Sequence, residues 1–149
     1  MKSLSRTRVA LAAALTLFLP VLFARPSLAA TINVLYTFAG GTDGAGPYGG
    51  LIFDSAGNLY GTTVSGGVYD QGTVFELALN VDGTYSETVL HSFDSTSGDG
   101  ASPYCSLAID KSGNLYGTTY YGGTYGNGTV FELNGRPIAC LVPPPNSAR

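Results

Sequence analysis

Short runs of β-branched and aromatic residues, separated by glycine-rich turns, recur along the chain from residue 31 to residue 133. Alternation of large and small side chains within these runs is typical of β-strands. Asp-Gly and Gly-Gly pairs between the runs are turn signals. The pattern therefore predicts an all-β chain. The first strands are expected at residues 31–38, 51–53, 58–64, 73–79 and 87–93.

The second half of the chain repeats the first. Residues 57–63 and 113–119 both read Gly-Asn-Leu-Tyr-Gly-Thr-Thr, and residues 72–77 and 128–133 both read Gly-Thr-Val-Phe-Glu-Leu. When the two copies are aligned without gaps, 20 of 31 positions are identical at a period of 56 residues. A duplication this close predicts that both copies form the same strands and turns.

Four short strands in a repeat of this length are typical of a β-propeller blade. We therefore expect one domain over residues 30–135, with two four-stranded antiparallel, blade-like repeats at about 47–93 and 103–133. The expected strand at 31–38 ends in Leu-Tyr-Thr-Phe, which matches Leu-His-Ser-Phe at 90–93. We expect it to be the outer strand of a further blade, so that the chain forms an incomplete propeller.

The two ends of the chain differ from this domain in composition. Residues 1–29 combine basic residues, an apolar run and a final Ser-Leu-Ala, which is typical of a secretory signal peptide. We therefore expect an exported protein, located outside the cell, in the periplasm or at the cell surface, with no membrane span after signal removal. Residues 136–149 form a proline-rich tail.

Removal of the signal peptide makes the chain more acidic than its full-length net charge of −3. The three remaining basic residues, Lys111, Arg136 and Arg149, then accompany ten acidic residues, and the net charge is 3 − 10 = −7. An acidic surface repels phosphate backbones, so that nucleic acid is not expected as a partner.

Cys105 and Cys140 are the two cysteines of the chain. An exported protein meets oxidising conditions that permit a disulfide, but sequence spacing does not fix whether two thiols are close enough to pair. Neither cysteine has the spacing of a metal ligand. A disulfide and two free thiols are therefore both compatible with the sequence.

The combination of Asp-x-x-Gly-Asn-Leu-Tyr-Gly-Thr-Thr, Gly-Gly and Gly-Thr-Val-Phe-Glu-Leu resembles the GloVer repeat, a tandem repeat of exported bacterial proteins from groups such as Verrucomicrobia. The resemblance covers residues 34–133. It implies a tandem-repeat protein with no established activity, so that no catalytic residue can be assigned from it. The Asp-x-x-Gly-Asn-Leu-Tyr portion is also similar to propeller repeats of the NHL kind, which implies the fold alone.

Few residues are candidates for catalysis. His91 is the only histidine, and its counterpart in the other copy of the pattern is Tyr36, which favours a structural ring position over a member of a triad. The sequence contains no Gly-x-Ser-x-Gly motif and no Gly-Lys-Ser/Thr phosphate loop. We therefore expect no enzyme activity, no cofactor, and no catalytic, cofactor-binding or metal site.

The acidic residues recur with the repeat, which favours structural roles. Asp54 and Asp110 are expected to cap the turns that follow them, and Glu76 and Glu132 to be exposed on strands.

Asp43 and Asp99 lie in Asp-Gly loops, where calcium binding and paired-carboxylate glycosidase chemistry are the alternatives to a structural role. One carboxylate in each loop is few for a cation that takes six to eight oxygen ligands.

Tyrosines near the glycine-rich loops are candidates for ligand contact, because tyrosine rings stack on sugars and make protein contacts. The tyrosines that both repeats retain are better explained by packing between blades. The candidates are Tyr60 and Tyr116, which are retained, and Tyr69, Tyr120, Tyr121 and Tyr125.

These observations favour an exported, non-catalytic repeat module for binding or surface interaction. The alternative is a fragment of a propeller enzyme or a lectin that acts on polysaccharide. The partners compatible with such a module are carbohydrate, a second copy of the chain and another repeat protein. Two blades are expected to leave apolar sheet faces open, so that residues 31–38 complete a blade of a neighbouring copy. The open faces are expected to carry Leu59, Val74 and Phe75, or their copies Leu115, Val130 and Phe131.

Overall fold

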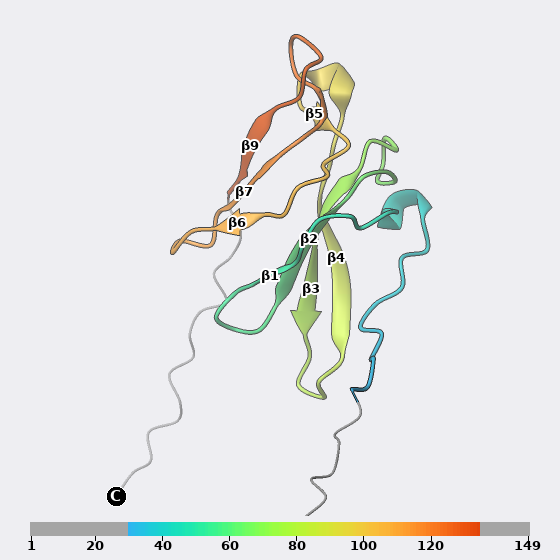
Figure 1. Cartoon of the computed structure of the whole chain (residues 1–149), viewed down its shortest axis with the longest axis vertical. Helices are drawn as coiled ribbons and strands as arrows, with labels where there is room; N and C mark the ends of the chain where they lie inside the picture. Colours follow the sequence, from blue (N-terminus) through green and yellow to red (C-terminus); the bar gives the residue numbers. More distant parts are fainter. Residues whose placement is uncertain (1–29, 135–149) are drawn as a thin grey trace, which may run out of the picture. The chain divides into compact units, whose positions relative to one another are not determined.

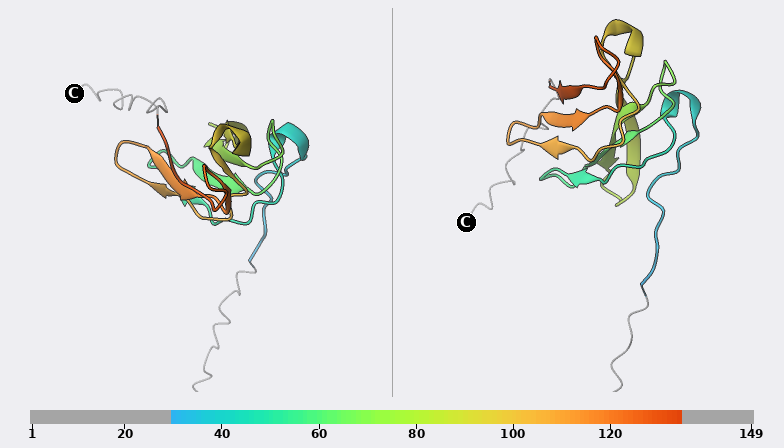
Figure 2. Two further views of the ribbon diagram at one scale, coloured as in Figure 1. Left: turned by 90° about the horizontal axis from the view of Figure 1, so that it is seen from above. Right: turned by 45° about the horizontal axis from the view of Figure 1, so that its top comes forward.

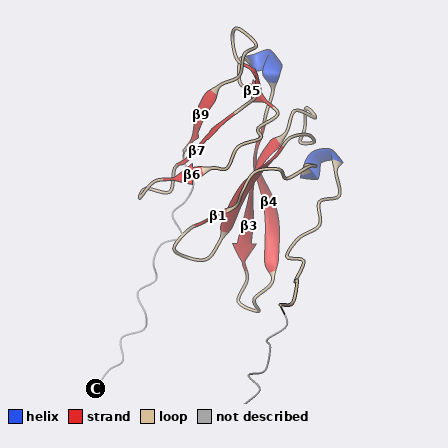
Figure 3. Ribbon diagram, in the orientation of Figure 1, coloured by secondary structure: helices blue, strands red, loops and turns tan. Residues whose placement is uncertain are grey.

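The computed structural model describes residues 30–134, and all the structure discussed below lies in the compact unit that begins at Asn33. These residues form antiparallel β-sheets and two short 3-10 turns, η1 (Gly41–Asp43) and η2 (Ser95–Ser97), as Figure 3 shows. The predicted all-β class is confirmed. The predicted signal peptide at 1–29 and the proline-rich tail at 136–149 lie outside the described residues.

The first repeat folds as a four-stranded antiparallel sheet in the order β1-β2-β3-β4 (Figure 1). Each strand pairs with the next one along the chain, because tight turns such as Asp54 to Gly57 reverse its direction. The strands are β1 (Ile52–Phe53), β2 (Leu59–Thr63), β3 (Thr73–Leu79) and β4 (Tyr85–Ser92).

The second repeat forms its own sheet, which has the same strand order as the first but contains three strands. β6 (Ala108–Ile109), β7 (Leu115–Thr118) and β9 (Val130–Leu133) pair in the order β6-β7-β9. β5 (Gly100–Ala101) and β8 (Tyr121–Gly122) form a separate two-stranded sheet beside them. Figure 2 shows β6, β7 and β9 in orange to red, distinct from the green to yellow sheet of the first repeat.

The two repeats share one register. Leu59 on β2 pairs with Leu77 on β3, and Leu115 pairs with Leu133 at the corresponding positions of β7 and β9. The sequence duplication is therefore a duplication of structure, although the sheets of residues 30–134 are open and close no ring.

One predicted strand does not form. Residues 31–38 pair with no strand in the described part of the chain. The aromatic and β-branched residues that favour a strand cannot form a ladder without a neighbouring edge. Tyr36 and Phe38 pack on a face of the first sheet instead, where the rings of Phe38 and Phe75 meet edge to face at 4.9 Å between centroids.

The core consists of two clusters, one on each face of the first sheet. Alternate residues of a strand point to opposite faces. One cluster joins Tyr60 and Val74 to Phe93 and to Leu107 and Leu115 of the second repeat. The other consists of Leu59, Phe75 and Leu77, covered by Tyr36, Phe38 and Tyr85.

The expectation that both repeats expose apolar faces is therefore partly wrong. Leu59, Val74, Phe75 and Leu115 are buried, because the 36–38 segment covers one face of the first sheet and the second repeat covers the other. Val130 fits the expectation, with 83% of its surface exposed.

A glycine in the second strand of each sheet admits an aromatic ring, as its position inside a strand predicts. A Cβ atom on Gly61 would lie 2.6 Å from Cζ of Phe75. In the second repeat, a Cβ atom on Gly117 would lie 2.5 Å from Cζ of Phe131. Larger residues at these positions would displace the rings that fill the core.

Phe93 is fully buried and belongs to the cluster that joins the two repeats. Replacing Phe93 by Ala is expected to lower the free energy of unfolding by about 3 kcal/mol or more, because it removes a ring from a packed site. The matched control is Phe53→Ala, at a ring that is 64% exposed, with an expected change within about 0.5 kcal/mol. Urea unfolding followed by circular dichroism measures both, and equal losses would contradict the assignment.

Candidate functional site

The acid at the first turn of each repeat has the predicted capping role. Asp54 Oδ1 accepts hydrogen bonds from the backbone N–H groups of Ala56 and Asn58, at 2.9 Å each. Asp110 Oδ1 accepts the same pair from Ser112 and Asn114 at 2.8 and 2.9 Å. Burial by itself raises the pKa of Asp54, but hydrogen bonds from Tyr60 and Asn58 outweigh it and lower the pKa.

A buried tyrosine hydroxyl lies between two carboxylates in the first repeat. The Tyr60 oxygen is 2.8 Å from Asp54 Oδ2 and 2.6 Å from Glu76 Oε1. Glu76, expected to be exposed, is therefore half-buried and helps to hold the ring. The second repeat repeats the arrangement with Tyr116 and Glu132, at 2.9 Å, on an exposed surface.

The loop acids Asp43 and Asp99 hold aromatic rings. The Tyr36 hydroxyl donates to Asp43 Oδ1 at 2.7 Å, and this hydrogen bond raises the pKa of Tyr36 to about 12. At the equivalent place in the repeat, His91 Nε2 lies 2.6 Å from Asp99 Oδ2. The histidine thus replaces a tyrosine in a structural contact, as the sequence comparison predicts.

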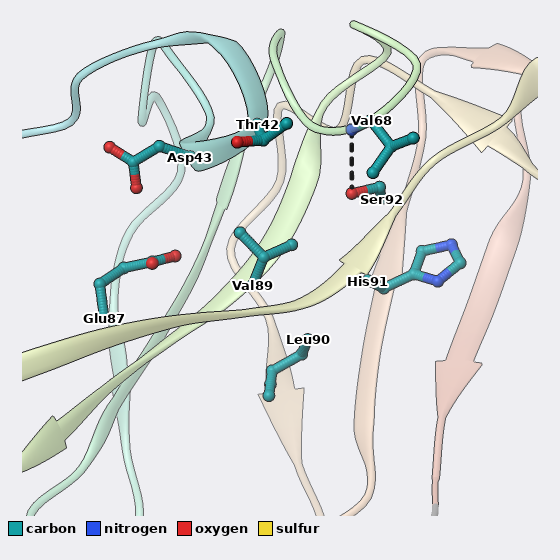
Figure 4. Close-up of a pocket in the computed structure, with 8 residues that line it drawn as sticks. All are labelled: Thr42, Asp43, Val68, Glu87, Val89, Leu90, His91 and Ser92. Atoms are coloured by element: carbon teal, nitrogen blue, oxygen red, sulfur yellow. Dashed lines mark hydrogen bonds between the residues drawn. The ribbon is translucent and has the colours of Figure 1, made fainter.

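A pocket of about 530 Å³ lies between η1 and β4 (Figure 4). Asp43 and Glu87 lie on the same side of it, whereas the ring of His91 lies on the other side. The backbone N–H of Val68 donates to Ser92 Oγ at 3.2 Å and closes one wall. The lining residues are Thr42, Asp43, Val68, Glu87, Val89, Leu90, His91 and Ser92.

Glu87 is the unusual residue of this pocket. Its buried Oε1 has no hydrogen-bond partner among the described residues. Burial and then the charge of Asp43 raise the pKa of Glu87 to about 7. The side chain therefore exchanges a proton near neutral pH, which is the property of a general acid or base.

A second candidate surface is an exposed row of four tyrosines. The ring centroids of Tyr48 and Tyr104 are 5.8 Å apart, those of Tyr104 and Tyr120 are 5.9 Å apart, and those of Tyr120 and Tyr121 are 4.5 Å apart. These four rings are between 52% and 72% exposed. We call them the tyrosine patch; it draws one ring from the first repeat and three from the second.

The tyrosines that the sequence suggests for ligand contact occupy different environments in the structure. Tyr60 is buried between the repeats, which agrees with its predicted packing role, and Tyr116 is exposed on the outer face of the second sheet. Tyr120 and Tyr121 belong to the tyrosine patch. Tyr69 is exposed and makes none of the patch contacts.

In the described part of the chain, no group of three or more His, Cys, Asp or Glu residues is placed to hold a metal ion. Cys105 forms no disulfide with another described residue, and its Sγ lies 3.1 Å from the backbone nitrogen of Thr118. Cys140 lies outside the described residues, so that the pairing of the cysteines stays a prediction. No helix of the described residues is long and apolar enough to cross a membrane.

The comparisons with known proteins agree with this picture of a structural repeat. The family model of the Gloeobacter/Verrucomicrobia repeat matches residues 20–139. The chain belongs to the Gloeobacter/Verrucomicrobia repeat (GloVer) family. No curated protein matches the chain.

Sequence reasoning overlooked two features of this GloVer protein. Tyr48 and Tyr104 stand in identical Pro-Tyr dipeptides, a signal that identifies equivalent positions but not that the two rings meet. Glu87 was expected only as part of a strand, because its environment is formed by η1, more than forty residues earlier in the chain.

Replacing Glu87 by Gln is expected to change how the stability of the GloVer domain depends on pH. The folded state raises the pKa of Glu87 from 4.5 to about 7, so it binds a proton that the unfolded chain releases. The stability that this proton binding contributes to the folded state is fully present below the unfolded pKa of Glu87, and it is lost as the pH rises towards 7. Because the carboxyl is partly open to water, we expect only about 1 kcal/mol.

Glu87→Gln should therefore be more stable than the original chain at about pH 8 and nearly equal to it at about pH 5. The measurement is urea unfolding across this pH range, with Glu132→Gln as the control for removal of a carboxylate. Parallel pH profiles of the original chain and the Glu87→Gln variant would contradict the raised pKa.

Proposed function

We propose that this GloVer protein is an exported, non-catalytic module that binds a neutral polysaccharide through the tyrosine patch. The observation that carries the proposal is the continuous contact of four exposed rings, Tyr48, Tyr104, Tyr120 and Tyr121. Exposed apolar surface that is contiguous marks interaction sites more reliably than scattered single residues. Tyrosine supplies both a flat apolar ring and a hydroxyl, which suits the faces and edges of sugars.

The charge of the domain supports a neutral ligand. Lys111 is the one cation among residues 30–134, whereas all ten acidic residues lie in this range. A ligand with many negative charges would be repelled. A polysaccharide without charge avoids this repulsion and can extend over rings from both repeats.

Replacing Tyr104 by Ala is expected to weaken polysaccharide binding about tenfold, because Tyr104 joins Tyr48 to Tyr120 in the patch. The matched control is Tyr69→Ala, at a tyrosine that is 54% exposed and makes none of the patch contacts. Binding is measured by retardation in native gels that contain soluble glucan, xylan or mannan, and by co-sedimentation with cellulose and chitin. Unretarded migration and no co-sedimentation of the original chain, or equal losses in both variants, would reject the proposal.

Polysaccharide hydrolysis is the alternative function, and one observation favours it. Glu87, with its raised pKa, and Asp43 are two carboxylates that line one pocket, as a general acid and its partner do in glycosidases. Against this assignment, Asp43 is engaged by Tyr36 and by the backbone N–H of Ala39 at 2.6 Å. Its hydrogen bonds explain its position without a substrate.

The expected result is that the purified chain releases no reducing sugar from glucan, xylan, mannan, cellulose or chitin. Hydrolysis that is lost in Glu87→Gln and in Asp43→Asn, and retained in Glu132→Gln, would establish the enzyme instead. This outcome is independent of the Tyr104→Ala result, so that the two functions can be distinguished.

A further inference from the structure

The contact between the two repeats of this chain defines a docking geometry. Val74 and Tyr60 project from the first sheet and are fully buried in the cluster that contains Leu115 and Phe93. Nearby, the Thr62 hydroxyl lies 3.1 Å from the carbonyl oxygen of Cys105. One face of a repeat therefore recognises the opposite face of the repeat that follows it.

The equivalent face of the second repeat is uncovered. Val130 corresponds to Val74 in the duplication, but it is 83% exposed, whereas Val74 is completely buried. Tyr116 corresponds to Tyr60 and is 36% exposed, against 0% for Tyr60. The second repeat thus carries the docking face of the first with nothing from the described residues packed on it.

The edge of the second sheet is uncovered as well. β3 pairs with β2 on one side and with β4 on the other, whereas β9 pairs with β7 alone among the described strands. An unpaired edge exposes a row of backbone donors and acceptors, which is a template for another strand. Within residues 30–134, no counterpart of β4 pairs with β9.

Residues 35–38 resemble the end of β4 and the residue that follows it, both in sequence and in contacts. Phe38 meets Phe75 at 4.9 Å between ring centroids, and Phe93 meets Phe131 at 5.1 Å, both edge to face. Phe93 directly follows β4 and packs on the next repeat. The segment before Phe38 therefore has the place of a fourth strand that has no sheet of its own among the described residues.

We propose that the second repeat of one chain binds the first repeat of a second copy head to tail, and that residues 32–37 of that copy form the fourth strand on β9. The pairing of β3 with β4 fixes the register. Thr73 pairs with Ser92 and Val74 pairs with His91, and a shift in register follows between Val74 and Phe75. Each β3 residue has its equivalent on β9 56 positions later, and each β4 residue has its equivalent in the N-terminal segment 55 positions earlier. The same pairing therefore places Thr37 opposite Thr129, Tyr36 opposite Val130 and Val34 opposite Phe131.

One difference between the repeats prevents the contact between two copies from fully matching the contact between the two repeats of one chain. A Cβ atom on Gly49 would lie 2.2 Å from the carbonyl oxygen of Cys105, so the contact inside the chain requires glycine at this position. The equivalent of Gly49 in the second repeat is Cys105 itself. Its side chain lies where the backbone near residue 49 of the second copy would approach. Association between copies is therefore weaker than the contact between repeats, and removal of this side chain strengthens it.

The proposed interface joins two different faces of the chain. Such a heterologous contact leaves a free docking face at each end of a dimer, so that association continues to larger rings or to open chains. The inference does not depend on carbohydrate binding, because Val130, Tyr116 and Cys105 are not among the four rings of the tyrosine patch.

The exported full chain is tested by size-exclusion chromatography with light scattering over micromolar to millimolar concentration. Mass is expected to rise with concentration beyond that of a dimer. Val130→Glu is expected to raise the apparent dissociation constant about tenfold or more, because it places a charge in the docking face. Val81→Glu is the matched control, at a valine in the turn between β3 and β4 that is also fully exposed, and is expected to leave the association unchanged.

Cys105→Gly provides the opposite test, with an expected increase in association of about tenfold. Unfolding midpoints of all variants are compared at low concentration to show that the monomer remains folded. A monomer at every concentration for both the original chain and the Cys105→Gly variant would overturn the proposal. A dimer that grows no further, or equal effects of Val130→Glu and Val81→Glu, would overturn it too.

Discussion

The edge-to-face contact between two phenylalanines is the constraint on which each repeat depends. One ring follows the fourth strand of the preceding sheet, and the other stands on the third strand of the repeat itself, as in Phe93 with Phe131. A glycine on the adjacent strand leaves the room that the second ring fills. Replacing this glycine, moving either ring or removing the preceding strand disturbs the same volume, because interiors are packed closely. Successive repeats are therefore linked through their cores and not only through their loops.

This linkage explains which parts of the fold could be predicted from the sequence. The third strand was predicted at the residues where β3 is found, because alternation and turn signals are local properties. The turn at Asp54 was predicted because its donors are two and four residues away. Residues 31–38 have equally strong local signals but form no strand, because pairing requires an edge that the described chain does not offer at that place.

The candidate sites were harder to predict, because they depend on contacts distant in sequence. Tyr48 and Tyr104 are 56 residues apart, and they meet only because equivalent loops of the two repeats lie side by side. The raised pKa of Glu87 depends first on burial of its side chain. Alternation along β4 places Glu87 on the less exposed face with Tyr85 and Val89, but it does not indicate that η1 lies across that face. Repetition indicates that a residue is part of the common design, whereas a site arises where the repeats meet or differ.

Residues 30–134 contain ten acidic residues and a single Lys or Arg, and hydrogen bonds explain how such an acidic domain remains folded. Nine of its ten carboxylates accept hydrogen bonds from backbone N–H groups or from side chains. The contact of His91 with Asp99 becomes an ion pair only when the histidine is protonated. Such bonds fix turns and rings at short range, and salt screens them less than it screens exposed ion pairs. The carboxylates are thereby committed to structure, which leaves few acids for chemistry. Glu87 is the exception, because its buried Oε1 accepts no hydrogen bond from the described residues, and its carboxyl group is therefore the one that the folded chain leaves available for proton exchange.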